Sequence, residues 1–242
     1  MNKRYLPFLL PIRSVIFILI FVIGSLVTGK AVTDISNWWT IVAVIVNVFV
    51  IALLLLIAKK GGMTFVELIN YEKGKTKVSQ VIVMVIVTFV VGMTVMYLAG
   101  FICYGVIPYT APMMVEPIPK VLAIANVILL PISTALAEDG LYLGVGVNNI
   151  KNKWAAIIVP AFFFALQHCF IPTFFDCRFV IYRFISFLPL TFIYSWYYQK
   201  KRNPLPIMIG HAAIDLLTAM LLLLTSMMPE LFEQMTTMNI ML

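Results

Sequence analysis

Long apolar runs dominate this chain and decide what it can fold into. Only 11% of its 242 residues are charged, which is too little polar surface to cover a water-soluble globule. Each run is close to the roughly 20 residues that cross a bilayer as a helix. We therefore predict an all-α, polytopic transmembrane bundle of about seven spans in the cell membrane. The predicted spans are 14–29, 38–58, 79–106, 119–148, 154–172, 179–199 and 205–228.

The basic residues predict how the bundle is oriented. Of the 17 Lys and Arg residues, all but Lys30, Lys120, Arg178 and Arg183 fall at one end of the predicted spans, and this larger set includes Arg13. Cytoplasmic loops carry an excess of Lys and Arg, so we expect the N-terminus in the cytoplasm and the C-terminus outside. Because the positive charge follows the loops, it indicates a lipid bilayer and no nucleic acid as partner.

The sequence predicts one integral membrane domain without internal repeats. Within it we distinguish N-terminal helices with a cytoplasmic loop (1–118), a helical core (119–228) and a C-terminal tail (229–242). Residues 65–69 suit either a short helix on the membrane face or an ordinary loop. The pair Gly140 and Gly144 predicts close helix packing. Cys103, Cys169 and Cys177 lack metal-ligand spacing and are expected to be small buried residues.

Titratable side chains interrupt three of the apolar runs. Glu138 and Asp139 lie in the fourth run, His168 in the fifth, and His211 and Asp215 in the seventh. An ionised acid at the centre of a bilayer costs roughly 2.5–3.5 kcal/mol even on lenient insertion scales. Packing alone does not offset that cost, so the set as a whole indicates a functional site.

The depths of these residues agree. A helix rises about 1.5 Å per residue, so counting from the nearest basic residues puts Glu138 about 20 Å, His168 about 22 Å, His211 about 14 Å and Asp215 about 20 Å into the membrane. His211 and Asp215 are four residues apart and share a helix face, as do Phe164 and His168. We expect the polar groups of the three helices to meet in one cavity.

Several intramembrane mechanisms are unsupported by the residues. Neither histidine begins an H-E-x-x-H motif, and no G-x-S-x-G nucleophile motif occurs. Cys169 adjoins His168, but neighbours on a helix point about 100° apart, which disfavours a Cys-His dyad. The mechanism that these residues still allow is one in which a carboxylate and two imidazoles surround a water. Glu138, His168 and His211 could also bind zinc, but we expect no metal and no cofactor.

The three polar segments resemble the three motifs of the CAAX protease and bacteriocin-processing family of intramembrane endopeptidases. The family's motifs are Glu-Glu-x-x-x-Arg, Phe-x-x-x-His and His-x-x-x-Asn or Asp. Here they correspond to Glu138 through Leu143, Phe164 through His168, and His211 through Asp215. The order, spacing and helix placement of the segments carry the resemblance, which covers residues 119–226.

The resemblance implies a peptidase that cleaves a peptide or the tail of a membrane-anchored protein, with residues 119–228 as its catalytic core. It implies that Glu138 and His168 activate a water and that His211 and Asp215 hold the oxyanion. Asp139 stands at the second acidic position of the first motif. No cofactor is implied.

Two positions depart from the family's motifs. The second acid is Asp139 instead of Glu, and Leu143 stands where the motif has arginine. Without that arginine, Asp139 should be protonated or point elsewhere. Arg183 is expected to reach the outer membrane surface instead of replacing it.

These departures keep a second hypothesis open, a catalytically degenerate relative that acts as an immunity or regulatory membrane protein through helix contacts. A third hypothesis is a proton- or cation-coupled transporter that uses the buried acids as carriers.

Overall fold

The computed structural model describes residues 3–109 and 111–240, and helices make up its regular structure. The predicted all-α, polytopic bundle is therefore confirmed over these residues. The N-terminal half contains η1 (Lys3–Leu9), α1 (Ile12–Thr28), α2 (Val32–Ile35), η2 (Ser36–Trp38), α3 (Trp39–Lys60), α4 (Phe65–Leu68) and α5 (Val78–Tyr104). The C-terminal half contains α6 (Pro112–Val115), α7 (Lys120–Thr134), η3 (Ala135–Val147), α8 (Ala155–His168), α9 (Cys177–Lys201), α10 (Leu205–Met227) and α11 (Pro229–Ile240).

We predicted about seven spans, and six helical stretches of the described chain are long and apolar enough to cross a membrane. The six stretches are Tyr5–Thr28, Val32–Lys60, Val78–Tyr104, Lys120–Val147, Cys177–Lys201 and Leu205–Met227.

The exception is α8, which has 14 residues and is therefore about 21 Å long, shorter than the roughly 30 Å hydrocarbon core. Pro172 keeps the helix from continuing through the rest of the apolar run, because the residue before a proline, here Ile171, is disfavoured in the α-helical conformation.

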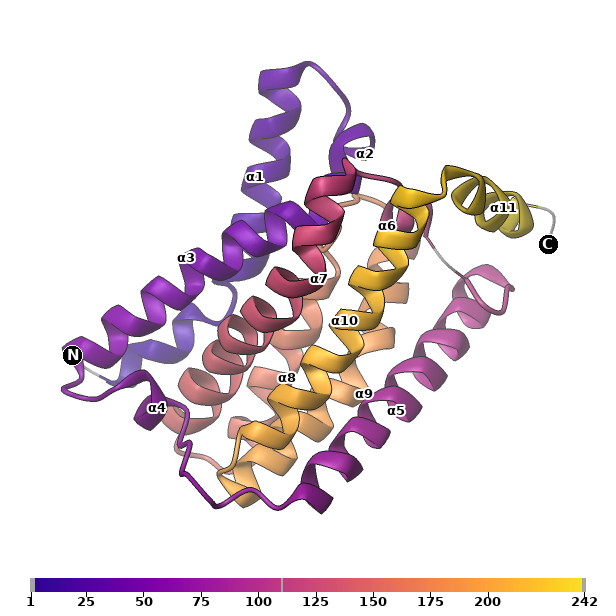
Figure 1. The fold of residues 1–242 in the computed structure, drawn as a ribbon. Helices are drawn as coiled ribbons and strands as arrows, with labels where there is room; N and C mark the ends of the chain where they lie inside the picture. The colour runs from indigo at the N-terminus through magenta and orange to yellow at the C-terminus, as the bar shows by residue number, and fades with distance from the viewer. Residues whose placement is uncertain (1–2, 110, 241–242) are drawn as a thin grey trace.

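The long helices form one bundle in which α10 lies between α7 and α5, with α3 on the far side of α7 (Figure 1). Behind this front layer, α8 and α9 pack against each other, and α9 also packs against α5. The short helix α6 connects α5 to α7 and contacts α10. The three helices that carry the acids and histidines, η3, α8 and α10, are thus brought together in the interior.

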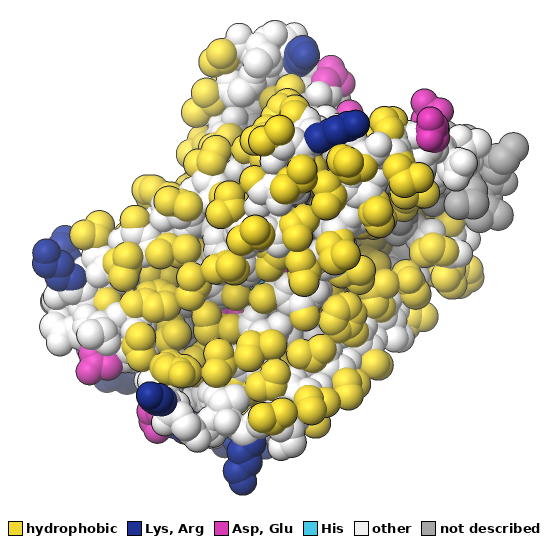
Figure 2. Space-filling model, in the orientation of Figure 1, with side chains coloured by type: hydrophobic (Ala, Val, Ile, Leu, Met, Phe, Trp, Pro, Cys, Tyr) yellow, Lys and Arg dark blue, Asp and Glu magenta, His cyan; other side chains and the backbone are white. Residues whose placement is uncertain are grey.

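The outer surface matches a lipid environment. Figure 2 shows hydrophobic side chains across the middle of one face, with charged side chains at its ends. The aliphatic residues exposed on α3 and α7 include Ile45, Val48, Ile128 and Ile132. Together with the six apolar helices, this surface identifies a multi-pass membrane protein.

The loop between α3 and α5 contains the short helix α4. Thr64 caps this helix, because its hydroxyl accepts a hydrogen bond from the Glu67 backbone N–H (3.2 Å) while the Glu67 carboxylate accepts one from the Thr64 N–H (2.7 Å). These bonds to Thr64 lower the pKa of the Glu67 carboxyl. Leu68 is buried against the bundle. Of the two structures expected for 65–69, the short helix is observed, docked onto the protein core.

Glycines on η3 allow this docking. A Cβ on Gly140 would lie 2.7 Å from Leu54 of α3, and one on Gly144 would lie 3.0 Å from Ile69, next to α4. The predicted role of both glycines in close packing is therefore confirmed.

A third close approach holds α10 against α5. A Cβ on Gly210 would lie 2.7 Å from the Thr88 hydroxyl and 3.3 Å from the Met84 carbonyl oxygen. Thr88 cannot easily move, because its hydroxyl already donates to Met84 (2.8 Å) and pairs with the Tyr194 hydroxyl (2.6 Å). Gly210→Ala should therefore destabilise the bundle by about 1–3 kcal/mol, measured by thermal unfolding in detergent.

The control for this prediction is Leu216→Val on the same helix, at a residue that is 38% exposed. We expect it to change stability by no more than about 0.5 kcal/mol. Equal stability of the Gly210→Ala variant and the unmodified protein would contradict the close approach.

Candidate active site

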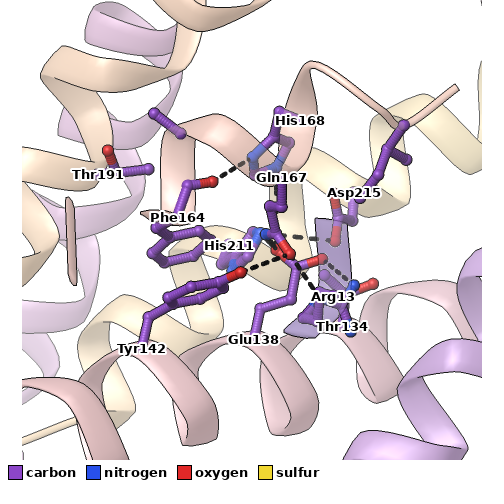
Figure 3. Close-up of polar contacts among 12 residues, drawn as sticks. Arg13, Thr134, Glu138, Tyr142, Phe164, Gln167, His168, Thr191, His211 and Asp215 are labelled. Carbon is purple, nitrogen blue, oxygen red and sulfur yellow. Dashed lines mark hydrogen bonds and ion pairs between the residues drawn. The ribbon is translucent and has the colours of Figure 1, made fainter. Parts of the chain in front are cut away.

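Four of the predicted site residues converge on one point at the centre of the bundle (Figure 3). The Oε2 atom of Glu138 lies 3.8 Å from Nε2 of His168 and 3.8 Å from Nε2 of His211. Nε2 of His211 also lies 3.8 Å from Oδ2 of Asp215. All four side chains line the same cavity. The expectation that three helices deliver their polar groups to a common cavity is therefore met.

Asp139 occupies a different position. Its Oδ1 atom lies 3.2 Å from Nδ1 of His211, and its Oδ2 atom has no hydrogen-bond partner. It is absent from the residues that line the cavity. As expected without a motif arginine, Asp139 points elsewhere, and it contacts the side of the His211 ring opposite Glu138.

The ring of His168 is held in a defined state. Its Nδ1 atom lies 2.8 Å from the carbonyl oxygen of Phe164, which can only accept, so Nδ1 carries the hydrogen. In the neutral ring, Nε2 is then an acceptor that faces Glu138. The ring of Phe187 stacks on the imidazole with 3.7 Å between centroids, and Phe164 lies on it at 5.9 Å. The backbone carbonyl of Phe164 and the ring of Phe187 thus fix the orientation of His168.

The prediction for the position of Arg13 is wrong. We predicted it among the basic residues at the cytoplasmic end, but it is completely buried, and its Nη2 atom donates to Oε1 of Glu138 at 2.7 Å. Apolar runs lie on both sides of Arg13, ending at Ile12 before it and beginning at Val15 after it, unlike the surroundings of Lys3 and Arg4. That flanking pattern is the signal that could have identified a buried position.

Two amides complete the surroundings of Arg13, and sequence analysis missed both. The Gln167 carbonyl accepts from Nε of Arg13 at 2.5 Å, while its Nε2 donates to Oε2 of Glu138 at 2.5 Å. The Asn47 carbonyl accepts from Nη1 of Arg13 at 2.7 Å, and its amide donates to the Thr134 hydroxyl at 3.0 Å. Each guanidinium nitrogen therefore has a partner, as burial of a charge requires.

Arg183 is also buried, so the prediction that it reaches the outer surface is wrong. Its exposed fraction is 4%. Its Nε donates to the carbonyl oxygen of His168 at 3.1 Å, and its Nη2 donates to that of Ile171 at 2.7 Å. These carbonyls lie where α8 has ended and have lost their helical partners. Arg183 therefore stabilises the early end of α8.

A cavity of about 230 Å³ connects the converging groups to apolar walls on α5, α9 and α10. Asp215 keeps 22% of its side chain exposed, and its Oδ2 atom has no hydrogen-bond partner. Glu138, His168 and His211 are more deeply buried. Polar groups with free hydrogen-bonding positions therefore face an otherwise apolar space, which is typical of a ligand or substrate site.

The described residues contain no group of three or more His, Cys, Asp or Glu side chains arranged to hold a metal ion. The cysteines are free thiols, of which Cys169 is buried, Cys103 is partly buried and Cys177 is exposed. The expectation of three buried cysteines is therefore wrong for Cys177.

The ion pair of Arg13 and Glu138 generates a stability prediction. Removing one partner of a buried pair leaves an uncompensated charge and costs about 3–5 kcal/mol, whereas replacing both by apolar groups costs much less. We expect Arg13→Met to lose about that much stability and Arg13→Met combined with Glu138→Leu to recover most of it. Thermal unfolding of both variants measures the difference.

Lys30→Met is the control, because Lys30 is exposed, and it should leave the unfolding temperature nearly unchanged. Additive losses in the double variant would mean that the two side chains are not coupled.

The comparisons with known proteins agree with this geometry. The family model described as type II CAAX prenyl endopeptidase Rce1-like matches residues 120–217. No curated protein matches the chain, and no solved structure matches it. At the level of the family, the match supports a CAAX-type intramembrane protease. The matched segment contains the five acids and histidines predicted from the motifs. The match to residues 120–217 agrees with the resemblance of the three motifs to this family.

Proposed function

We propose that this protein is an intramembrane endopeptidase in which Glu138 and His168 activate a water for attack on a peptide bond. The observation that carries the proposal is the 3.8 Å gap between Oε2 of Glu138 and Nε2 of His168. Hydrogen bonds to water are about 2.8 Å long, so one water fits beside the gap and reaches both atoms. His168 offers an acceptor there, and so does the carboxylate.

The reaction then follows from the positions of these groups. The water oxygen attacks the carbonyl carbon, forming a C–O bond, while its proton passes to Glu138 or His168. The tetrahedral intermediate collapses, the C–N bond breaks, and the same proton goes to the leaving amine. General acid-base catalysis of this kind contributes about 10²–10⁴-fold to a rate.

His211 is suited to hold the oxyanion. Oxygens of Glu138, Asp139 and Asp215 lie within 3.8 Å of its ring nitrogens. In the protonated ring, Nδ1–H donates to Asp139 and Nε2–H is directed into the cavity. A donor preorganised in an apolar site stabilises developing negative charge strongly. Asp139 is thus a positioning residue, and Asp215 contributes as a second donor when protonated.

Arg13 supports an enzyme over a degenerate relative. The case for a non-enzymatic relative depended on Leu143 at the motif's arginine position and on Asp139 at its second acidic position. Leu143 is fully buried, and the guanidinium of Arg13 reaches the carboxylate of Glu138 from α1 instead. By holding Oε1, Arg13 fixes the direction of Oε2 toward the two histidines. The first acid therefore has a cationic partner despite the altered motif.

The same guanidinium favours a metal-independent reaction. Both oxygens of Glu138 already accept hydrogen bonds, one from Arg13 and one from Gln167. A divalent cation bound to this carboxylate would have a positive charge beside it. The proposal is therefore a water activated by protein groups alone.

The test is cleavage of internally quenched peptides, with and without a farnesylated C-terminal cysteine, by the full-length protein in proteoliposomes. We expect Glu138→Gln and His168→Ala each to lower kcat by about 10²–10⁴-fold. Glu72→Gln is the matched control, because Glu72 is exposed and lies in the loop before α5, and it should retain full activity. Undiminished cleavage by both site variants would end the catalytic assignment.

A chelator tests the second part of the proposal. We expect 1,10-phenanthroline to leave the rate of peptide cleavage unchanged, because no zinc-bound water is needed. A zinc endopeptidase assayed in parallel with the same chelator should lose its activity. Loss of activity that added zinc restores would replace this mechanism by a metal-dependent one.

A further inference from the structure

Serine and threonine side chains form part of the wall of the cavity at the candidate site. They are Thr134, Ser186, Thr191 and Thr218. Each hydroxyl carries one hydrogen to donate and two lone pairs that accept. A hydroxyl can therefore donate to a ligand in the cavity only when no protein acceptor already holds its hydrogen.

Three of these hydroxyls already donate their hydrogen to the backbone. The acceptors are carbonyl oxygens of the helices: Ser186 donates to Tyr182 at 2.7 Å, Thr191 to Ala161 at 2.9 Å, and Thr218 to Ile214 at 3.2 Å. These three side chains are thus occupied by the protein itself.

The hydroxyl of Thr134 is used in a different way, because its oxygen accepts. The Nδ2 amide of Asn47 donates to Oγ1 of Thr134 at 3.0 Å. Arg13 settles this direction, since a guanidinium can only donate. Its Nη1 atom donates to the carbonyl oxygen of Asn47 at 2.7 Å, so the other end of that amide is the NH₂ group. The hydrogen of Thr134 must therefore point away from Asn47.

The neighbouring Ser133 shows what Thr134 lacks. Nδ2 of Asn47 also donates to Oγ of Ser133 at 3.0 Å, and Ser133 passes its own hydrogen to the carbonyl oxygen of Leu130 at 3.3 Å. Among the described contacts, Thr134 has no such backbone acceptor. The carboxyl group of Asp215 neighbours the Thr134 hydroxyl and lines the same cavity (Figure 3). The hydrogen of Thr134 therefore faces the cavity.

Thr134 also lies close to the groups proposed to react. It precedes Glu138 by four residues in one continuous helical stretch, and both side chains line the cavity. Its neighbour Asp215 places Oδ2 3.8 Å from Nε2 of His211. Thr134 is therefore next to the side chains that are assigned to the oxyanion.

The bonds behind Thr134 prepare its hydroxyl to donate. The charge of Arg13 polarises the amide of Asn47, and that amide in turn polarises the hydroxyl, as happens along chains of hydrogen bonds in a site of low dielectric. Thr134 is only 5% exposed, so water does not compete freely for its oxygen. A donor that is fixed before the reaction stabilises developing negative charge without reorganisation.

We propose that Thr134 is a further catalytic residue, whose hydroxyl donates its hydrogen to the carbonyl oxygen of the scissile peptide bond as that oxygen becomes negative. It acts beside His211 on the same oxygen and forms no covalent bond with the substrate. Asn47 is the positioning residue that turns the hydroxyl toward the cavity. This inference rests on the proposed peptidase function.

The test is Thr134→Val, which replaces the hydroxyl by a methyl group of similar size. We expect kcat for the quenched peptides in proteoliposomes to fall by about 10²-fold, the lower end of the loss for one oxyanion donor. KM should change little, because the bond strengthens only in the transition state. Thr134→Ser should restore most of the rate. Full activity of Thr134→Val would overturn the proposal.

Two further threonines separate a free hydrogen from general polarity. Thr225→Val is the matched control, because Thr225 is buried, lies outside the cavity lining and donates to the carbonyl oxygen of Leu222 at 3.0 Å. It should retain full activity. Thr218→Val changes the cavity wall at an occupied hydroxyl and should lower kcat much less than Thr134→Val. Equal losses at positions 134 and 218 would contradict the proposal.

A double variant distinguishes contact with the substrate from an effect through Asp215. In an Asp215→Leu background, Thr134→Val should lower kcat further, because the hydroxyl contacts the substrate itself. An unchanged rate in that background would mean that Thr134 acts only by orienting Asp215, and the proposal would fail. Thermal unfolding shows whether Thr134→Val folds, and Thr134→Ala, which removes the hydroxyl without a new methyl group, replaces it when it does not.

The failure of this inference differs from the failure of the proposed function. Loss of cleavage in Glu138→Gln together with full cleavage in Thr134→Val would remove Thr134 from the reaction and leave the peptidase standing. Full cleavage in Glu138→Gln and His168→Ala would remove the peptidase assignment and this inference with it.

Discussion

The buried ion pair between Arg13 and Glu138 organises the interior of this protein. Moving two charges out of water costs several kcal/mol per ion, and their attraction repays this only when further hydrogen bonds satisfy the remaining atoms. Here those bonds come from Asn47 and Gln167. One guanidinium thus joins α1, α3, η3 and α8, four elements that are far apart in the sequence. Each of these four elements contributes a side chain to the hydrogen bonds around this one guanidinium.

This arrangement changes how the chain should be divided. The motif resemblance places all catalytic candidates after residue 118, with the earlier helices as a separate N-terminal part. Arg13 and Asn47 lie in that earlier part, yet they contact the carboxylate and its partner directly. Residues from both sides of the predicted boundary at residue 118 therefore form the candidate site. Side chains from the N-terminal helices complete a carboxylate that the family's core segment alone leaves without a cation.

The two oxygens of Glu138 have separate surroundings. Oε1 faces the guanidinium, whereas Oε2 faces the two imidazoles and the cavity. In the reaction proposed above, this fixed positive charge on one oxygen would keep the carboxylate from rotating. This is the preorganisation that makes electrostatic stabilisation effective in a site of low dielectric. Asp139 contacts Nδ1 of His211 and so restrains that ring from the side opposite Glu138.

Some of these features could be predicted from the sequence alone. Helical rise and four-residue spacing depend on local geometry, so the convergence of Glu138, His168, His211 and Asp215 could be predicted. The roles of Arg13 and Gln167 depend on which helices are neighbours, and no local pattern encodes that. Arg13 resembles an ordinary basic flank until its apolar neighbours are considered. The length of α8 was overestimated because the apolar run continues beyond His168 while the helix does not.

The short helix α8 has a consequence for the surrounding lipid. Ile158 and Phe162 expose an apolar face there, but the helix is about 9 Å shorter than the hydrocarbon layer. A bilayer meets such a mismatch by thinning locally. The protein would then sit in a shallow depression of the membrane, deepest beside His168, so that headgroups and interfacial water approach the candidate site more closely than its position along the chain suggests.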